Sequence, residues 1–120
     1  MDFNKNMPIY IQIIDYLKFK IASGEIQPSS KFKSVRELAQ EMNVNPNTMQ
    51  RAFAELERDG LVFSNRTSGR YVCDDKEKID SMRDSLASKE IEALVTTLKS
   101  LGYTYEDMIN LIESNIKGMK

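Results

Sequence analysis

The sequence predicts a mainly α-helical fold with one small β-hairpin. Apolar residues recur at helical spacings of three and four over five stretches, whereas only two short runs are rich in β-prone residues. The length of 120 residues fits one small domain with an appendage.

The first helix is predicted over residues 8–23. Its apolar positions, which lie along one broad face, are Ile9, Tyr10, Ile13, Ile14, Leu17 and Ile21. Pro8 suits a first helical position because its missing N–H needs no partner there, and Ser23-Gly24 suits the end. Residues 3–6 are expected to form a mobile arm, with docking of Phe3 on the core as the alternative. Residues 26–33 lack helical spacing and are predicted to be a connector.

Two further helices are predicted close together. Ser34 and Glu37 form a capping-box pattern, in which each side chain accepts the backbone N–H of the other residue, and a short helix follows over residues 35–42. Asn45 and Pro46 suit the N-cap and first residue of a second helix, which ends at Gly60. Two helices joined by so short a turn are typical of a helix-turn-helix.

A β-hairpin is predicted directly after this pair. Residues 61–64 and 70–73 are rich in β-prone side chains, and residues 65–69 between them are turn-forming. A helix-turn-helix followed by a hairpin is the order of a winged helix. We therefore assign residues 1–74 to a winged helix-turn-helix domain.

Residues 75–120 show no strand signal and are predicted to form two helices. The longer, over residues 77–100, has an apolar stripe that drifts by roughly a quarter turn, so we expect its halves to face different partners. Gly102 ends it and Thr104 caps the next helix, whose stripe is Tyr105, Met108, Ile109, Ile112 and Ile116. Such a helical hairpin cannot bury both stripes by itself. Its neighbour is either the winged domain or a second copy of the chain.

The composition excludes most enzyme classes. There is no histidine and only one cysteine, which removes an imidazole base, Ser-His and Cys-His pairs, an intrachain disulfide, and histidine or thiolate-cage metal sites. We therefore expect no catalytic residue, no cofactor and no metal. The absence of an apolar signal segment or a membrane-length apolar run predicts a cytoplasmic protein. Cys73 is expected to be a small buried hydrophobe, with a redox-sensing thiol as the alternative.

Four motifs follow one another in the predicted winged domain. They are Pro8-Ile9-Tyr10-Ile11-Gln12-Ile13, then Ser34-Val35-Arg36-Glu37-Leu38-Ala39, the run over residues 44–52, and Leu56-Glu57-Arg58-Asp59-Gly60-Leu61. Together they resemble the GntR family of bacterial transcription regulators. The Asn-Pro-Asn-Thr turn at 45–48 and the short helical C-terminal region resemble its YtrA-like branch. The resemblance implies a recognition helix in the major groove, C-terminal helices that hold a homodimer, and no large effector domain.

The sequence departs from the family pattern in the connector, the turn and the wing. The family usually has Pro-Gly where this chain has Pro28-Ser29, Leu-Pro-Ser where it has Phe32-Lys33-Ser34, and two wing glycines at the positions of Thr67 and Gly69. Many relatives have a base-reading arginine at the position of Pro46. Operator preference therefore cannot be carried over from those relatives.

The placement of charge points to DNA although the net charge is only -1. No Asp or Glu occurs in residues 28–36, 42–54 or 61–73, while Glu55, Glu57 and Asp59 crowd the far end of the predicted recognition helix. An acid-free N-terminal end suits phosphate, and helix-turn-helix proteins present side chains to base edges there. The predicted DNA-contacting residues are Lys33, Ser34, Arg36, Asn45, Asn47, Thr48, Gln50, Arg51, Arg66, Gly69 and Arg70.

Asn47 and Gln50 are the base-reading candidates because Asn and Gln can pair bidentately with adenine. The resemblance gives DNA-contacting roles to Arg36, Thr48 and Gly69 as well.

Three of these residues have a competing role. Asn45 can cap its helix instead of reading a base. Arg36 can pair with Glu37 or Glu41, and Arg51 with the glutamate four residues further on.

We predict a sequence-specific DNA-binding transcription regulator, in the form of a homodimeric repressor on a roughly palindromic operator. A winged-helix module that docks a protein and does not bind DNA is the alternative, which the near-neutral charge permits. The expected partners are double-stranded DNA and a second copy of the chain, without a membrane. A small-molecule effector is left open.

Overall fold

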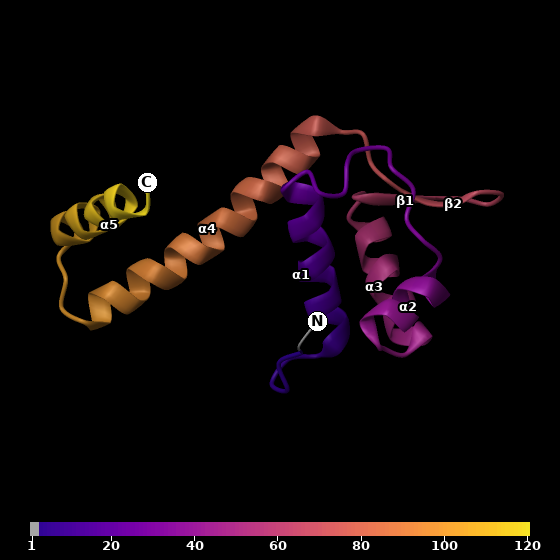
Figure 1. Ribbon diagram of the computed structural model, residues 1–120, viewed down its shortest axis with the longest axis horizontal. Coiled ribbons are helices and arrows are strands. Elements are labelled where there is room, and N and C mark those ends of the chain that lie inside the picture. Colours follow the sequence, from indigo (N-terminus) through magenta and orange to yellow (C-terminus); the bar gives the residue numbers. More distant parts are fainter. Residues whose placement is uncertain (1–2) are drawn as a thin grey trace. The chain divides into compact units, whose positions relative to one another are not determined.

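In the computed structural model, which describes residues 3–120, the chain forms five helices and one antiparallel hairpin (Figure 1). The elements are α1 (Ile9–Ala22), α2 (Val35–Met42), α3 (Pro46–Arg58), β1 (Val62–Asn65), β2 (Gly69–Val72), α4 (Lys76–Ser100) and α5 (Tyr105–Met119). The predicted fold class, mainly α with a winged helix-turn-helix, is confirmed. None of the helices in the described residues is both long and apolar enough to cross a membrane.

The chain divides into two units, Met1–Arg83 and Asp84–Lys120, which we call the winged unit and the helical unit. The division falls inside α4, whereas the sequence suggested a boundary at residue 74. The reason is that the first turns of α4 pack on the winged unit. Ile79 is buried in its core, and Arg83 Nε donates to the carbonyl oxygen of Ala22 at 3.1 Å.

The helix-turn-helix is set by local capping, as its sequence indicates. The Ser34 hydroxyl accepts the N–H of Glu37 at 3.1 Å, and the Glu37 carboxylate accepts the N–H of Ser34 at 3.3 Å. Asn43 adopts φ +55 and ends α2, because Asn tolerates the left-handed region better than most residues. Asn45 caps α3. These caps orient the two helices on either side of a short turn.

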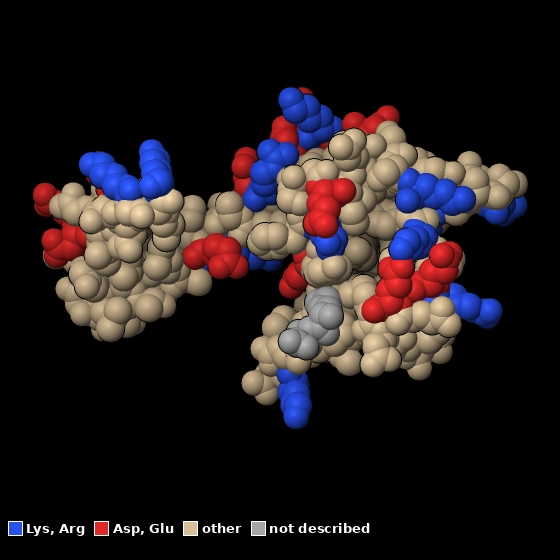
Figure 2. Space-filling model, viewed as in Figure 1, with Lys and Arg blue, Asp and Glu red and all other residues tan. Residues whose placement is uncertain are grey.

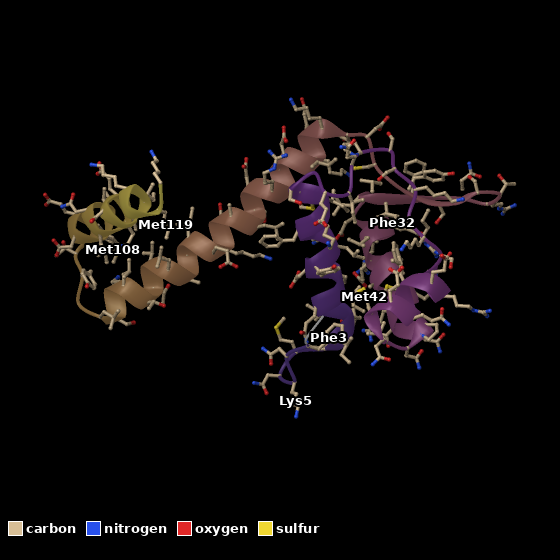
Figure 3. The ribbon with its side chains drawn as sticks, in the orientation of Figure 1. Phe3, Lys5, Phe32, Met42, Met108 and Met119 are labelled. Carbon is tan, nitrogen blue, oxygen red and sulfur yellow. The ribbon has the colours of Figure 1, made fainter. Side chains whose placement is uncertain are left out.

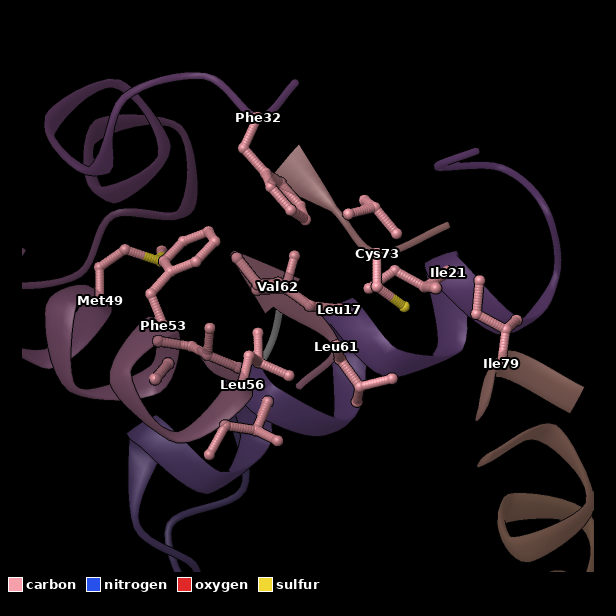
Figure 4. Packing of buried hydrophobic residues seen from close by; sticks show 14 of the residues in the cluster. Leu17, Ile21, Phe32, Met49, Phe53, Leu56, Leu61, Val62, Cys73 and Ile79 are labelled. Carbon is pink, nitrogen blue, oxygen red and sulfur yellow. The ribbon is translucent and has the colours of Figure 1, made fainter. Parts of the chain in front are cut away.

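The core of the winged unit is centred on Phe53 of α3. Phe53 is fully buried, and its ring meets the ring of Phe32 edge-on at 5.1 Å between centroids. Figure 4 shows these rings with Met49, and shows Cys73 and Ile79 at the other end of the same core. Cys73 is buried, as expected for a small hydrophobe.

The connector does more than link two helices. Phe32 N–H donates to the carbonyl of Arg70 at 2.9 Å, and Val72 N–H donates to the carbonyl of Ser30 at 2.9 Å, so the connector lies along β2. Ser29 adopts φ +66 at the position where the resembling family usually has glycine. A non-glycine residue in this left-handed region costs about 1 kcal/mol, which the pairing with β2 offsets.

The segment before α1 is tied to the helix by hydrogen bonds, so of the two expectations for residues 3–6 the structure shows the docked one. Gln12 Nε2 donates to the carbonyls of Asn4 and Met7 at 2.7 and 3.0 Å, and Gln12 Oε1 accepts the N–H of Asn4 at 2.7 Å. Phe3 packs on the core, which was the stated alternative. Lys5 stands at the outer end of the resulting turn (Figure 3).

The helical unit consists of the rest of α4 and α5. Thr104 caps α5 through a second capping box, in which its hydroxyl accepts the N–H of Asp107 at 3.1 Å. Leu98 and Met108 are its buried apolar residues. The apolar stripe of α4 therefore packs in two different units, since Ile79 is buried in the winged unit and Leu98 in the helical unit.

Candidate nucleic-acid interface

Helix α3 has one buried face and one exposed face. Met49, Ala52, Phe53 and Leu56 are fully buried and fix the helix against the core. At 100° per residue, Asn47, Arg51 and Ala54 lie on the opposite side, and all three are exposed. Because the core anchors one face over its whole length, the other face is rigidly available to a partner.

The N-terminal end of α3 carries no acidic residue in its first turn. Asn45 Oδ1 accepts the N–H of Asn47 at 2.8 Å, so the capping role of Asn45 is realised. The side chains of Asn47 and Gln50 are exposed and make no hydrogen bond within residues 3–120. Thr48 is half-buried. This end thus presents the positive end of the helix dipole together with two free amide side chains.

The acidic end of α3 is paired with basic side chains. Glu55 forms an ion pair with Arg58, and Asp59 lies 3.9 Å from Lys18 Nζ. Glu57 accepts Arg70 Nε at 2.7 Å and also the hydroxyl of Ser64. Since Glu55 is taken by Arg58, the predicted alternative of an Arg51–Glu55 pair is not the one that forms.

Three arginines of the winged unit have no carboxylate partner within the described residues: Arg36 on α2, Arg51 on α3, and Arg66 in the turn between β1 and β2. All three are exposed. The two carboxylates close to Arg36 in sequence have other partners. Glu37 completes the capping box, and Glu41 forms an ion pair with Lys33. These arginines are therefore available to an anionic ligand.

Lys33 and Ser34 are occupied by the protein itself. The pKa of Lys33 is raised because its ammonium donates a hydrogen bond to Glu41. The Ser34 hydroxyl accepts the N–H of Glu37 as the cap of α2. Both side chains are exposed next to Arg36, so they flank that arginine while holding the start of α2 in place.

The wing combines an open turn with a braced base. Asn65 Oδ1 accepts both the N–H and the hydroxyl of Thr67, at 3.1 and 3.0 Å, and Gly69 adopts φ +114. Thr67, where the family usually has glycine, is not among the described residues with positive φ, so its side chain is accommodated. Figure 2 shows basic atoms at the tip of the hairpin, without acidic atoms beside them on that face.

Arg70 packs against α3 instead of pointing to a free surface. Its Nε donates to Glu57, and its guanidinium carbon lies 5.5 Å from the centroid of the Phe53 ring. The pKa of Glu57 is lowered, first by the hydrogen bond from the Ser64 hydroxyl and then by Arg70. Of the arginines predicted to contact DNA, Arg70 is thus the one whose observed contacts give it a bracing role.

Sequence reasoning missed the partners of these arginines. The guanidinium carbon of Arg51 lies 3.7 Å from the centroid of the Tyr10 ring, which belongs to α1. Glu57 and Ser64, which hold Arg70, were also not foreseen. Spacing rules find partners three or four residues apart in one helix, whereas these pairs join different elements. The one sequence feature that could have indicated a partner for Arg70 is the cluster of acidic residues Glu55, Glu57 and Asp59.

Comparison with known proteins places the chain among transcription regulators. The family described as bacterial regulatory proteins, gntR family, matches residues 9–72. The chain is 37% identical over 116 residues to YhcF, an uncharacterized HTH-type transcriptional regulator of Bacillus subtilis, with coverage of 97% of this chain and 96% of the relative. It is 32% identical over 124 residues to the HTH-type transcriptional repressor YtrA of Bacillus subtilis, with coverage of 100% and 95%.

Solved structures agree with the sequence relatives. A GntR family transcriptional regulator from Listeria monocytogenes has a TM-score of 0.87 and 35% identity over 93% of this chain and 98% of that chain. The DNA-binding domain of AraR in complex with operator ORR3 has a TM-score of 0.54 and 29% identity, over 61% of this chain and 86% of that chain. The likeness to the operator complex involves about the length of the winged unit.

Proposed function

The chain belongs to the GntR family of bacterial regulatory proteins, in its YtrA branch, and is a DNA-binding transcription regulator; we propose that it acts as a homodimeric repressor on a roughly palindromic operator. The family is one of transcription regulators and not of enzymes. The observations that carry the proposal are the two free amide side chains near the start of α3 and the three exposed arginines of the winged unit, Arg36, Arg51 and Arg66, which pair with no carboxylate among the described residues. A surface that only docks a protein has no need for this combination.

The proposed contacts divide into phosphate binding and base reading. Arg36, Arg51 and Arg66 are assigned to phosphates because they are exposed and have no ion-pair partner over residues 3–120. Asn47 and Gln50 are assigned to base edges, where each good bidentate contact discriminates by about 1–3 kcal/mol. These five residues form the proposed readout.

The other predicted contacts are assigned supporting roles. Gly69 is assigned to the turn of the wing, because its φ of +114 is a conformation that residues with a side chain rarely adopt. Thr48 lies half-buried beside Asn47, where its methyl group can meet a thymine. Asn45 and Ser34 were predicted to contact DNA, and their side chains cap α3 and α2.

The helical unit is proposed to hold the dimer. Its exposed large apolar side chains are Ile91, Leu94, Leu101, Tyr103, Tyr105, Ile109, Ile116 and Met119. So much apolar surface on a stretch of two helices is typical of an interface between protein chains. A two-fold dimer relates two recognition helices by one axis, so the operator half-sites follow the same symmetry. Because the ligand is chromosomal DNA, we propose a cytoplasmic location.

Selection of bound duplexes from a random pool tests the proposal directly. We expect a roughly palindromic consensus, and an affinity that falls with salt by a log–log slope of about -0.9 for each neutralised phosphate. Recovery of unrelated sequences, or binding that salt does not change, would show that the protein is not a sequence-specific regulator.

Two substitutions separate base reading from phosphate binding. Gln50→Ala should relax preference at one base pair in each half-site and leave binding to scrambled duplexes nearly unchanged. Arg36→Ala should weaken binding to both duplexes and reduce the salt slope by about 1 per half-site. Fluorescence anisotropy over a salt series with both duplexes measures each quantity. Equal losses on both duplexes for Gln50→Ala would contradict its base-reading role.

A further inference from the structure

The contact between Tyr10 and Arg51 joins the first helix to the recognition helix. The guanidinium carbon lies 3.7 Å above the centroid of the ring, which is stacking distance. Tyr10 is half-buried and Arg51 is exposed. The ring therefore belongs to the packed body of the winged unit, while the cation lies on its surface.

Stacking holds an arginine without using its hydrogen-bond donors. The N–H groups of a guanidinium lie in its plane, and a ring stacked on one face leaves them directed outward. The ion pairs of Arg58 and Arg70 do the opposite, because each directs an N–H group to a carboxylate of the same chain. Arg51 is thus fixed in direction and still has its donors free for a phosphate.

The stack also competes with a local ion pair. Glu55 lies four residues after Arg51, at the spacing of an ordinary helix pair. In the structure Glu55 binds Arg58 and the ring of Tyr10 takes Arg51. Removing the ring would free Arg51 to turn toward that carboxylate, where its charge would be partly neutralised.

The direction of the stack suggests which part of DNA Arg51 meets. Arg51 follows Asn47 by one turn on the exposed face of α3, and Tyr10 draws its side chain toward α1. Gln50 lies on the other flank of the same face. A side chain drawn to the flank of a recognition helix meets the wall of the groove, which is backbone phosphate, and not the base edges at its floor.

We propose that Tyr10 is a positioning residue, which holds the guanidinium of Arg51 in line with one DNA phosphate per half-site. The inference rests on the proposed DNA-binding surface of α3 and deepens it. It assigns a role in DNA affinity to a residue of α1 that does not itself touch DNA.

The test compares Tyr10→Leu with Tyr10→Phe, because phenylalanine keeps the aromatic face and leucine removes it. Tyr10→Leu should weaken binding about two- to fivefold, equally on the selected operator duplex and on a scrambled duplex. Tyr10→Phe should bind within about twofold of the unchanged protein, since phenylalanine also stacks on cations. Anisotropy titrations supply the affinities, and thermal melting of each variant shows that it is folded.

A double-mutant cycle with Arg51→Ala distinguishes positioning from packing. In the Arg51→Ala background, Tyr10→Leu should cause no further loss of affinity, because the residue that it positions is gone. Arg51→Lys keeps the charge but loses both the planar stack and the guanidinium donors, so it should lose at least as much affinity as Tyr10→Leu. These variants keep the test valid even if leucine lowers the melting temperature.

The outcomes separate this inference from the proposed function. If the unchanged protein does not bind DNA, the proposed function fails. If it binds, and Arg51→Ala weakens binding while Tyr10→Leu does not, the positioning role is overturned. The same conclusion follows if Tyr10→Phe loses as much as Tyr10→Leu, or if the two substitutions add fully in the double variant.

Discussion

The winged unit and the helical unit treat their apolar side chains in opposite ways. In the winged unit, side chains from all three helices, the connector and the hairpin converge on Phe53, and its buried cluster extends to Ile79 at the start of α4. In the helical unit, Leu98 and Met108 are buried, while Leu101, Ile109 and other large residues of the same stripes are exposed. The winged unit thus has a closed apolar core, whereas the helical unit leaves most of its large apolar side chains exposed.

This difference assigns the two units different sources of stability. A closed core gains its free energy from contacts within one chain, so the winged unit is expected to fold by itself. Two helices that expose most of their apolar stripes gain little from each other and need a further surface. Folding of the winged unit and association through the helical unit should therefore be separable by mutation.

The largest effect is expected from Phe53→Ala in the closed core. The side chain is 0% exposed, and truncating such a phenylalanine costs about 3–5 kcal/mol, which is most of the stability of a small domain. Urea denaturation should show this loss, and DNA binding should disappear with it. Phe63→Ala is the matched control, because Phe63 is 49% exposed and should cost less than about 1.5 kcal/mol. Similar losses for both would mean that the core is not centred on Phe53.

A smaller effect on folding, and a large one on assembly, is expected from Ile109→Asp in the helical unit. Ile109 is 65% exposed in the single chain, and burying such a side chain in a dimer contributes about 1.5–3 kcal/mol per copy. Light scattering should therefore show a shift from dimer to monomer, with the urea midpoint of the winged unit unchanged. Asn110→Asp introduces the same charge at the neighbouring exposed position and should leave the dimer intact. A dimer that survives Ile109→Asp would place the interface elsewhere.

The sequence predicted the parts of the fold that depend on neighbouring residues. The caps at Ser34, Asn45 and Thr104 fixed helix starts to within a residue, because a cap and its target N–H are two or three residues apart. The hairpin was placed within one residue of its observed strands. Such features need no knowledge of the rest of the chain.

Contacts between elements could not be predicted in the same way. The pairing of Ser30 with Val72, the hold of Gln12 on Asn4, and the stack of Arg51 on Tyr10 each depend on how elements pack. For the site, charge placement identified the acid-free end of α3, but it could not tell the free Arg51 from the braced Arg70. The availability of an arginine is a property of its partners, which a sequence position does not reveal.

The smallest effects come from removing one ion pair in each unit. The side chains of Arg70 and Glu57 are 25% and 31% exposed, whereas those of Lys117 and Glu113 are 73% and 61% exposed. Arg70→Gln should cost about 1–2 kcal/mol in urea denaturation because it breaks a partly buried, charge-assisted hydrogen bond. Lys117→Gln should cost less than about 0.5 kcal/mol, because an exposed helix pair is screened by water and salt.

The cost of Arg70→Gln should also depend on pH. Because the pKa of Glu57 is lowered from 4.5 in the folded state, its ionised form adds stability that is fully present above that value and is lost as the pH falls through the lowered pKa. Repeating the denaturation from neutral to acidic pH should bring the stabilities of Arg70→Gln and the unchanged protein together, while Lys117→Gln stays parallel to the unchanged protein. A constant difference down to pH values well below 4.5 would mean that Arg70 stabilises the wing through its cation–π contact with Phe53 and not through Glu57.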